Sequence, residues 1–159
     1  NTASRVPALV LDDGTVLTES LLILMWAERD RPQPALLGAN PAAALSLAGI
    51  AMGVIDAAVH TIVGRVITSG VPTDRSFDDL PVGLRRRRSM TTGFARLDEH
   101  LGGIDATQFD VVAMTSIAAL DYVDFRFPAA PWLPDLPNVR ALRAAHAERA
   151  SIAQTVPHD

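Results

Sequence analysis

The chain has 159 residues, with 14 basic and 18 acidic side chains and a formal net charge of −4. A hydrophobic share of 48% and a charged share of 20% are ordinary for one folded domain, or two small ones, and argue against disorder. The acidic balance disfavours a general nucleic-acid or anionic-membrane binder, because both need a basic face. With no cysteine, the chain has no cysteine nucleophile and no thiolate metal site, and its four histidines lack metal-ligand spacing, which disfavours zinc.

The first thirty residues are predicted to form a strand, a turn, a second strand and a helix. Residues 6–11 are short, apolar and β-prone, and Asp12, Asp13 and Gly14 make a strong hairpin signal before a return strand at 15–17. Apolar residues then recur at helical spacing, which predicts a helix from Ser20 that stops before Pro32. Pro7 cannot donate to a ladder and belongs at a strand start or edge, where a cis peptide is plausible.

The rest of the chain is predicted to be helical. A linker over residues 31–40 leads into helices at 41–68, 82–101 and 107–127, a fourth from about 138 and a short fifth near 151–155. The apolar run at 42–55 is too short to span a bilayer, and Asp56, His60 and Arg65 interrupt its continuation. We therefore expect a buried helix of a soluble protein.

Glu19 and Ser20 lie where the second strand meets the first helix. Free amides and the positive end of the helix dipole attract anions there, so a carboxylate ligand would fit. In the alternative interpretation, Ser20 caps the helix and Glu19 offsets its dipole. Taken alone, these two residues favour the alternative.

The order of the motifs resembles the glutathione S-transferase superfamily of bacterial cytosolic type. The segment RVPALVLDDGTVLTES resembles the end of its thioredoxin-like domain, and LAGIAMGVIDAAV resembles its long first helix of the helical domain. TQFDVVAMTSIAALDYVDFR resembles its buried helix with a capping box, and PNVRALRAAHAERASIAQTVP its closing helices. The resemblance implies three parts: half of a thioredoxin-like domain at 1–30, the linker at 31–40 and an all-α domain at 41–159.

The same resemblance implies a glutathione site at the start of the chain. Val6 would pair its main chain with the cysteinyl backbone of glutathione, next to a cis Pro7. Glu19 would meet the γ-glutamyl ammonium, and Ser20 with the helix amides would hold the adjacent carboxylate. Arg5 stands where relatives often carry a basic or amide residue, although a solvated arginine is the favoured interpretation.

The resemblance further implies a cytoplasmic homodimer that uses glutathione as co-substrate and a small hydrophobic electrophile, with no metal, nucleic acid or membrane. The family's first strand–helix–strand unit, which carries its catalytic Ser, Cys or Tyr, has no counterpart in this sequence. We expect that unit to exist outside the sequence, and a genuine truncation is the alternative. The competing function is a non-catalytic, dimeric binding or scaffolding protein of the same family.

Four other features have a structural and a functional interpretation. Thr107 and Asp110 fit a capping box, with the Thr107 hydroxyl accepting from the amide of residue 110 and Asp110 reaching back, so a structural role for Asp110 is favoured over a catalytic one. Asp56 and His60 are i,i+4 neighbours that could border a substrate cleft, although a structural pair is favoured. The arginines at 85–88 point around all sides of a helix and indicate a solvated face with interface or salt-bridge use. Aromatic residues that could wall a substrate pocket are more often core: Tyr122, Phe125, Phe127 and Trp132.

The long helix also carries glycines inside it. Gly49, Gly53, Ala57 and His60 recur at three- and four-residue steps, which predicts a smooth face that another backbone can approach closely. Such a face favours a dimer interface.

Overall fold

An antiparallel hairpin followed by a helix forms the first of two units, Asn1–Ala39 and Asn40–Asp159. The computed structural model describes Ser4, residues 6–30 and residues 35–158. Strand β1 (Ala8–Val10) pairs with β2 (Val16–Thr18), and Leu9 lies opposite Leu17. Gly14 makes the turn with a φ of 84°, which a residue without Cβ adopts at no steric cost. Helix α1 (Ser20–Asp30) follows at once and contacts β2.

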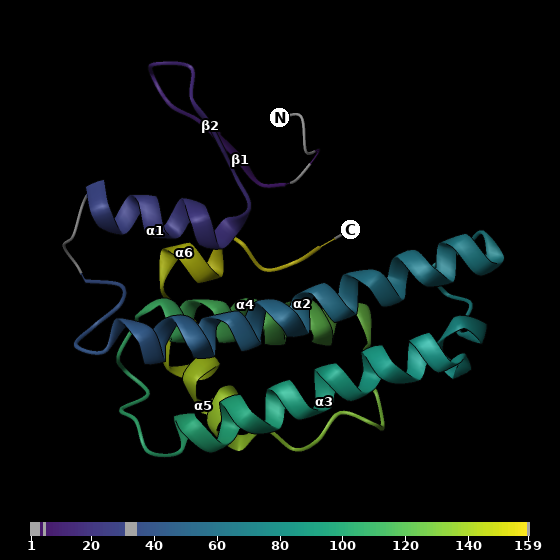
Figure 1. The fold of residues 1–159 in the computed structure, drawn as a ribbon. Helices are drawn as coiled ribbons and strands as arrows, with labels where there is room; N and C mark the ends of the chain where they lie inside the picture. The colour runs from purple at the N-terminus through teal and green to yellow at the C-terminus, as the bar shows by residue number, and fades with distance from the viewer. Residues whose placement is uncertain (1–3, 5, 31–34, 159) are drawn as a thin grey trace. The chain divides into compact units, whose positions relative to one another are not determined.

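The second unit is helical along its described length. It contains α2 (Pro41–Ser69), the short 3₁₀ helix η1 (Ser76–Asp79), α3 (Pro81–Leu101), α4 (Val111–Arg126), α5 (Pro137–Ala145) and α6 (Ala150–Ala153). Figure 1 shows α2 and α3 running side by side in opposite directions, with α4 along the other side of α2. A hairpin and helix followed by a helical bundle confirm the predicted fold class.

Local chemistry explains where α2 begins and ends. The Asn40 side chain accepts a hydrogen bond from the amide of Ala43 at 3.2 Å, and Pro41 occupies a position whose amide needs no partner. Gly70 ends the helix with a φ of 84° and returns its amide to the carbonyl of Val66 at 2.8 Å. The observed bounds agree with the sequence prediction to within one residue.

Small side chains let the neighbours of α2 approach it closely. Ala48, Ala51 and Ala58 are fully buried on this helix. On α3, a Cβ added to Gly93 would lie 2.6 Å from Cγ2 of Val54, so glycine is required for the present spacing. The core between α2, α3 and α4 is closed by large side chains such as Phe94, Leu97, Ile117 and Leu120.

Within the described ranges one helix, α2, has the length and hydropathy that a membrane span needs, with a mean hydropathy of 1.9 over its most apolar window. In the structure α3 and α4 pack along it, and side chains such as Val54 and Ala57 are buried. The core helix of a soluble protein passes the same test of length and composition, and 33% of this window is buried.

Candidate functional site

The start of β1 and the start of α1 carry the three residues for which we predicted a glutathione contact, which are Val6, Glu19 and Ser20. Val6 precedes β1, its side chain is 87% exposed, and no backbone partner for its N–H or C=O is found in the described ranges. The Val6–Pro7 peptide is cis, as expected from the sequence. The amide of Glu19 donates to the carbonyl of Pro7 at 3.3 Å, which ties the start of α1 to the start of β1.

Glu19 adopts an unusual backbone conformation for its type. Its φ is 63°, in the left-handed region that costs a non-glycine residue of the order of 1–3 kcal/mol. Its Oε1 atom accepts hydrogen bonds from the amides of Leu21 at 3.1 Å and Leu22 at 3.3 Å, and its carbonyl accepts from Ile23 at 3.2 Å. Residues that store strain in this way cluster at functional sites.

These contacts correct the alternative interpretation of the pair. The side chain that caps α1 is Glu19, and not Ser20 as that interpretation had it. Ser20 is half-buried, and its hydroxyl and amide make no hydrogen bond within the described part of the chain. The junction therefore offers one hydroxyl and one amide at a helix N-terminus, next to a carboxylate whose Oε2 atom makes no hydrogen bond with the described residues.

The arrangement suits a short peptide with charged ends. Unpaired main-chain groups beside a strand can pair with an extended peptide by strand addition. The start of α1 favours a carboxylate, and the Oε2 atom of Glu19 favours a cation. Arg5, which we considered as a further contact, lies outside the described residues.

The predicted capping box at the start of α4 is wrong in its register. The amide and the hydroxyl of Thr107 both donate to Oδ1 of Asp105, at 2.9 Å and 2.8 Å, so Thr107 does not cap α4. Helix α4 instead begins at Val111, and Asp110 is its N-cap, accepting from the amide of Ala113 at 2.9 Å. Asp110 therefore has the structural role that the sequence analysis favoured, and α4 begins about one turn later than predicted.

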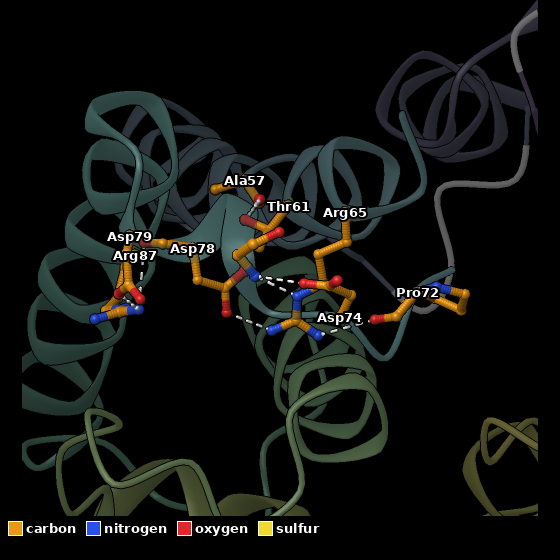
Figure 2. Close-up of polar contacts among 9 residues, drawn as sticks. Ala57, Thr61, Arg65, Pro72, Asp74, Asp78, Asp79 and Arg87 are labelled. Atoms are coloured by element: carbon orange, nitrogen blue, oxygen red, sulfur yellow. Dashed lines mark hydrogen bonds and ion pairs between the residues drawn. The ribbon is translucent and has the colours of Figure 1, made fainter. Parts of the chain in front are cut away.

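An ion pair that the sequence analysis missed lies between the end of α2 and η1 (Figure 2). Arg65 Nε donates to Oδ1 of Asp78 at 2.8 Å, Nη2 contacts Oδ2, and the side chains are only 6% and 9% exposed. Nη1 also reaches the carbonyl of Pro72 at 3.3 Å, and the guanidinium lies 5.0 Å from the ring centre of Phe127. The available signal was Arg65 itself, which stands four residues after the buried Thr61 on the inner face of α2.

The glycine face of α2 is only partly as predicted. Gly49 and Gly53 would tolerate a Cβ without any atom within 4 Å, but Ala57 is buried against the core. His60 is exposed, with Nδ1 lying 2.7 Å from the main-chain oxygen of Asp56 and 3.4 Å from its carboxylate. The close backbone approaches occur elsewhere, at Gly64, Gly83 and Gly93.

Several of the remaining candidates make structural contacts. Among the arginines at 85–88, Arg87 lies 3.8 Å from the carboxylate of Asp79, which is the salt-bridge use expected for this run. Phe127 is buried and meets Trp132 edge-on at 5.5 Å, as core residues do. Within the described ranges, no group of three or more His, Asp or Glu side chains could hold a metal ion.

Known proteins similar to this chain share one family description. The uncharacterised GST-like protein YibF of Escherichia coli strain K12 is 28% identical over 164 residues, covering 99% of this chain and 77% of that protein. No family model matches the chain.

Two solved structures extend this similarity to the fold. A glutathione S-transferase from Methylobacterium radiotolerans, in complex with glutathione sulfonate, superimposes with a TM-score of 0.85 at 28% identity, over 100% of this chain and 75% of that one. A glutathione transferase family member from Pseudomonas fluorescens Pf-5, with bound glutathione, gives a TM-score of 0.79 at 28% identity, over 100% and 77% of the two chains.

Proposed function

The chain belongs to the glutathione S-transferase superfamily, and from that premise we propose that it binds glutathione at the β1–α1 junction and conjugates the thiol of glutathione to a small hydrophobic electrophile. The observation that supports this proposal best is the exposed Val6, whose main chain has no partner in the described ranges, near Glu19 with its φ of 63°. The two relatives solved with glutathione or glutathione sulfonate support the choice of ligand.

Each residue of the junction has a separate role in this proposal. The N–H and C=O of Val6 pair with the cysteinyl unit of glutathione as an added strand would. The hydroxyl and amide of Ser20 bind the γ-glutamyl carboxylate at the positive end of α1. The Oε2 atom of Glu19 accepts from the γ-glutamyl ammonium, while Oε1 keeps α1 capped.

The chemistry that follows binding is thiol activation. Donors that hold the thiolate lower the barrier by electrostatic stabilisation, and the bound tripeptide is positioned for attack on the electrophile. We assign no residue of this sequence to hold the thiolate and no metal to the reaction. We place the protein in the cytoplasm on the strength of its family.

A non-catalytic, dimeric binding protein is the second candidate; the enzyme is implied to be a dimer as well, and the end of α2 exposes apolar side chains. Val63, Val66 and Ile67 are exposed there, and Ile67 is 80% exposed. We propose that a second copy of the chain covers them. Sedimentation should give a dimer at micromolar concentration that Ile67→Glu weakens and Ala141→Glu does not. A monomeric parent chain would exclude the dimer.

Retention on immobilised glutathione tests the binding site. The chain should be retained and eluted by free glutathione, and the double variant Glu19→Ala, Ser20→Ala should be lost in the wash. The matched control, Ser89→Ala with Glu99→Ala on exposed positions of α3, should be retained like the parent. Retention of the Glu19 and Ser20 double variant would remove this site assignment. A separate assay for turnover of an electrophile distinguishes the enzyme from the binding protein.

A further inference from the structure

The end of α2 and the start of α3 lie at the same end of the helical unit (Figure 1), and this end exposes apolar side chains. Four of them are between 45% and 48% exposed. These four residues, which we call the apolar tip, are Val71, Leu80, Val82 and Leu84. None of them belongs to the set that the proposed dimer covers. Exposed apolar side chains that gather in one place mark an interaction surface.

The segment that holds the apolar tip is basic, although the whole chain is acidic. Residues 65–88 contain six arginines and three aspartates, a formal charge of +3 in a chain whose total is −4. Arg65 and Asp78 neutralise each other inside the fold, and Arg87 lies 3.8 Å from Asp79. The arginines of this segment's helix that form no ion pair with the described residues are Arg85, Arg86 and Arg88. Three guanidinium groups are therefore left for an anionic partner.

The order of apolar and basic residues along α3 fits a layered partner. The midpoint of the arginine run at 85–88 lies about 7 Å further along the helix than Val82, at a rise of about 1.5 Å per residue. Segments that lie in a membrane interface bury their apolar side chains about 5–10 Å deep. With the apolar tip at that depth, the arginines lie at the level of the lipid phosphates.

The directions of the arginines favour lipid over protein. Consecutive residues on a helix point to different sides of it, so one flat, acidic protein face would meet only some of these guanidinium groups. Headgroups surround an inserted helix end on each open side and can meet them all. Arginine also matches phosphate with paired hydrogen bonds.

From these observations we propose that this end of the helical unit docks on an anionic lipid surface, with the apolar tip inserted between headgroups and Arg85, Arg86 and Arg88 bound to their phosphates. The contact is peripheral and does not span the bilayer. The acidic total charge argued against such a partner, but salt screens charges beyond about 8–10 Å, so the local arginines outweigh the distant acids. Lipid docking uses no residue of the β1–α1 junction, and either proposal can fail without the other.

Vesicle sedimentation with the full chain tests the basic part of the surface. The chain should sediment with vesicles of equal parts phosphatidylcholine and phosphatidylglycerol, and it should stay in solution with phosphatidylcholine alone. Arg85→Gln with Arg88→Gln should weaken binding about thirtyfold. The matched control, Arg96→Gln with Arg140→Gln, removes the same charge from exposed positions elsewhere and should bind like the parent. A parent chain that stays in solution with the mixed vesicles, or equal weakening by the two double variants, would refute the proposal.

A change without charge tests the apolar tip. Leu84→Ser should weaken binding to the mixed vesicles roughly fivefold, because the exposed half of the leucine side chain no longer enters the lipid. Leu22→Ser makes the same change on an exposed position of α1 and should bind like the parent. Circular dichroism should show that both variants are folded. Parent-like binding by Leu84→Ser would mean that the arginines act alone, as they would on an acidic protein, and would overturn the insertion of the apolar tip.

Discussion

Removing one partner of the buried pair between Arg65 and Asp78 should be the most damaging polar substitution in the helical unit. In Asp78→Asn the guanidinium stays buried and loses the charge that compensates it. The carbonyl of Pro72, 3.3 Å from Nη1, and the ring of Phe127 remain its neighbours, but neither carries a negative charge. The free energy of unfolding should therefore fall by about 3–5 kcal/mol, the range for a buried pair that is broken on one side.

The size of this loss follows from burial more than from the number of hydrogen bonds. With 6% and 9% of the two side chains exposed, water cannot solvate the charge left behind. Replacing both partners by apolar residues, as in Arg65→Met with Asp78→Leu, removes the charge as well as the pair. That double variant should recover most of the stability, because such replacements are often neutral.

Urea unfolding followed by circular dichroism at 222 nm measures these differences, and an unchanged m-value checks that the unfolding transition is the same. The exposed pair of Arg96 and Glu99 is the control, since its nitrogen and oxygen are equally close, at 2.8 Å, but its side chains are 56% and 72% exposed. Glu99→Gln should cost less than about 1 kcal/mol.

Equal losses for Asp78→Asn and Glu99→Gln would refute the reasoning, because the two pairs differ chiefly in burial. A double variant at 65 and 78 that is as unstable as Asp78→Asn would refute it too. In that case the geometry of the pair itself, rather than the uncompensated charge, would hold η1 against α2.

Three further outcomes are expected. Asp98→Ala should lower the free energy of unfolding in urea by about 2 kcal/mol. The Asp98 carboxylate caps α5, because it accepts from the amide of Asn138 at 2.9 Å and from the side-chain nitrogen of Asn138 at 3.1 Å. A loss within error of zero would contradict this. Asp110→Ala should cost about 1 kcal/mol and should leave any glutathione-dependent turnover intact, whereas loss of turnover without loss of stability would make Asp110 catalytic. The pKa of Asp105 should lie below its ordinary 3.8 in an NMR titration, because the amide and then the hydroxyl of Thr107 donate to the carboxylate. Since these bonds favour the ionised form in the folded chain, their contribution is present above pH 3.8 and is lost as the pH falls through the lower folded value, and titration at or above 3.8 would contradict it.

The sequence predicted the long helix and the hairpin well, because their signals are local. Pro41 and Gly70 mark the ends of α2 by their own backbone preferences, and Gly14 marks the turn between the strands in the same way. The start of α4 was misplaced because Asp105, Thr107 and Asp110 can all cap a helix, and only the folded chain shows which amide each carboxylate takes.

The site was predicted less completely than the fold. The cis peptide before Pro7 and the position of Glu19 at the helix start followed from the order of motifs. The capping hydrogen bond of Glu19 could not be predicted from the sequence, because a glutamate rarely adopts the left-handed backbone conformation that this bond requires. The pair of Arg65 with Asp78 escaped prediction for another reason: thirteen positions and a loop separate the partners, and periodicity says nothing about contacts across a loop.

The conformation of Glu19 has a consequence for how variants at this position would rank. A φ of 63° is reached without penalty by glycine, and glycine before a helix sacrifices only a few tenths of a kcal/mol in capping. Selection of a position-19 library for thermal resistance should therefore enrich glycine over glutamate. Selection of the same library for tripeptide capture should discard glycine. If the two selections enrich different residues at position 19, glutamate is kept there for ligand binding at a cost in stability.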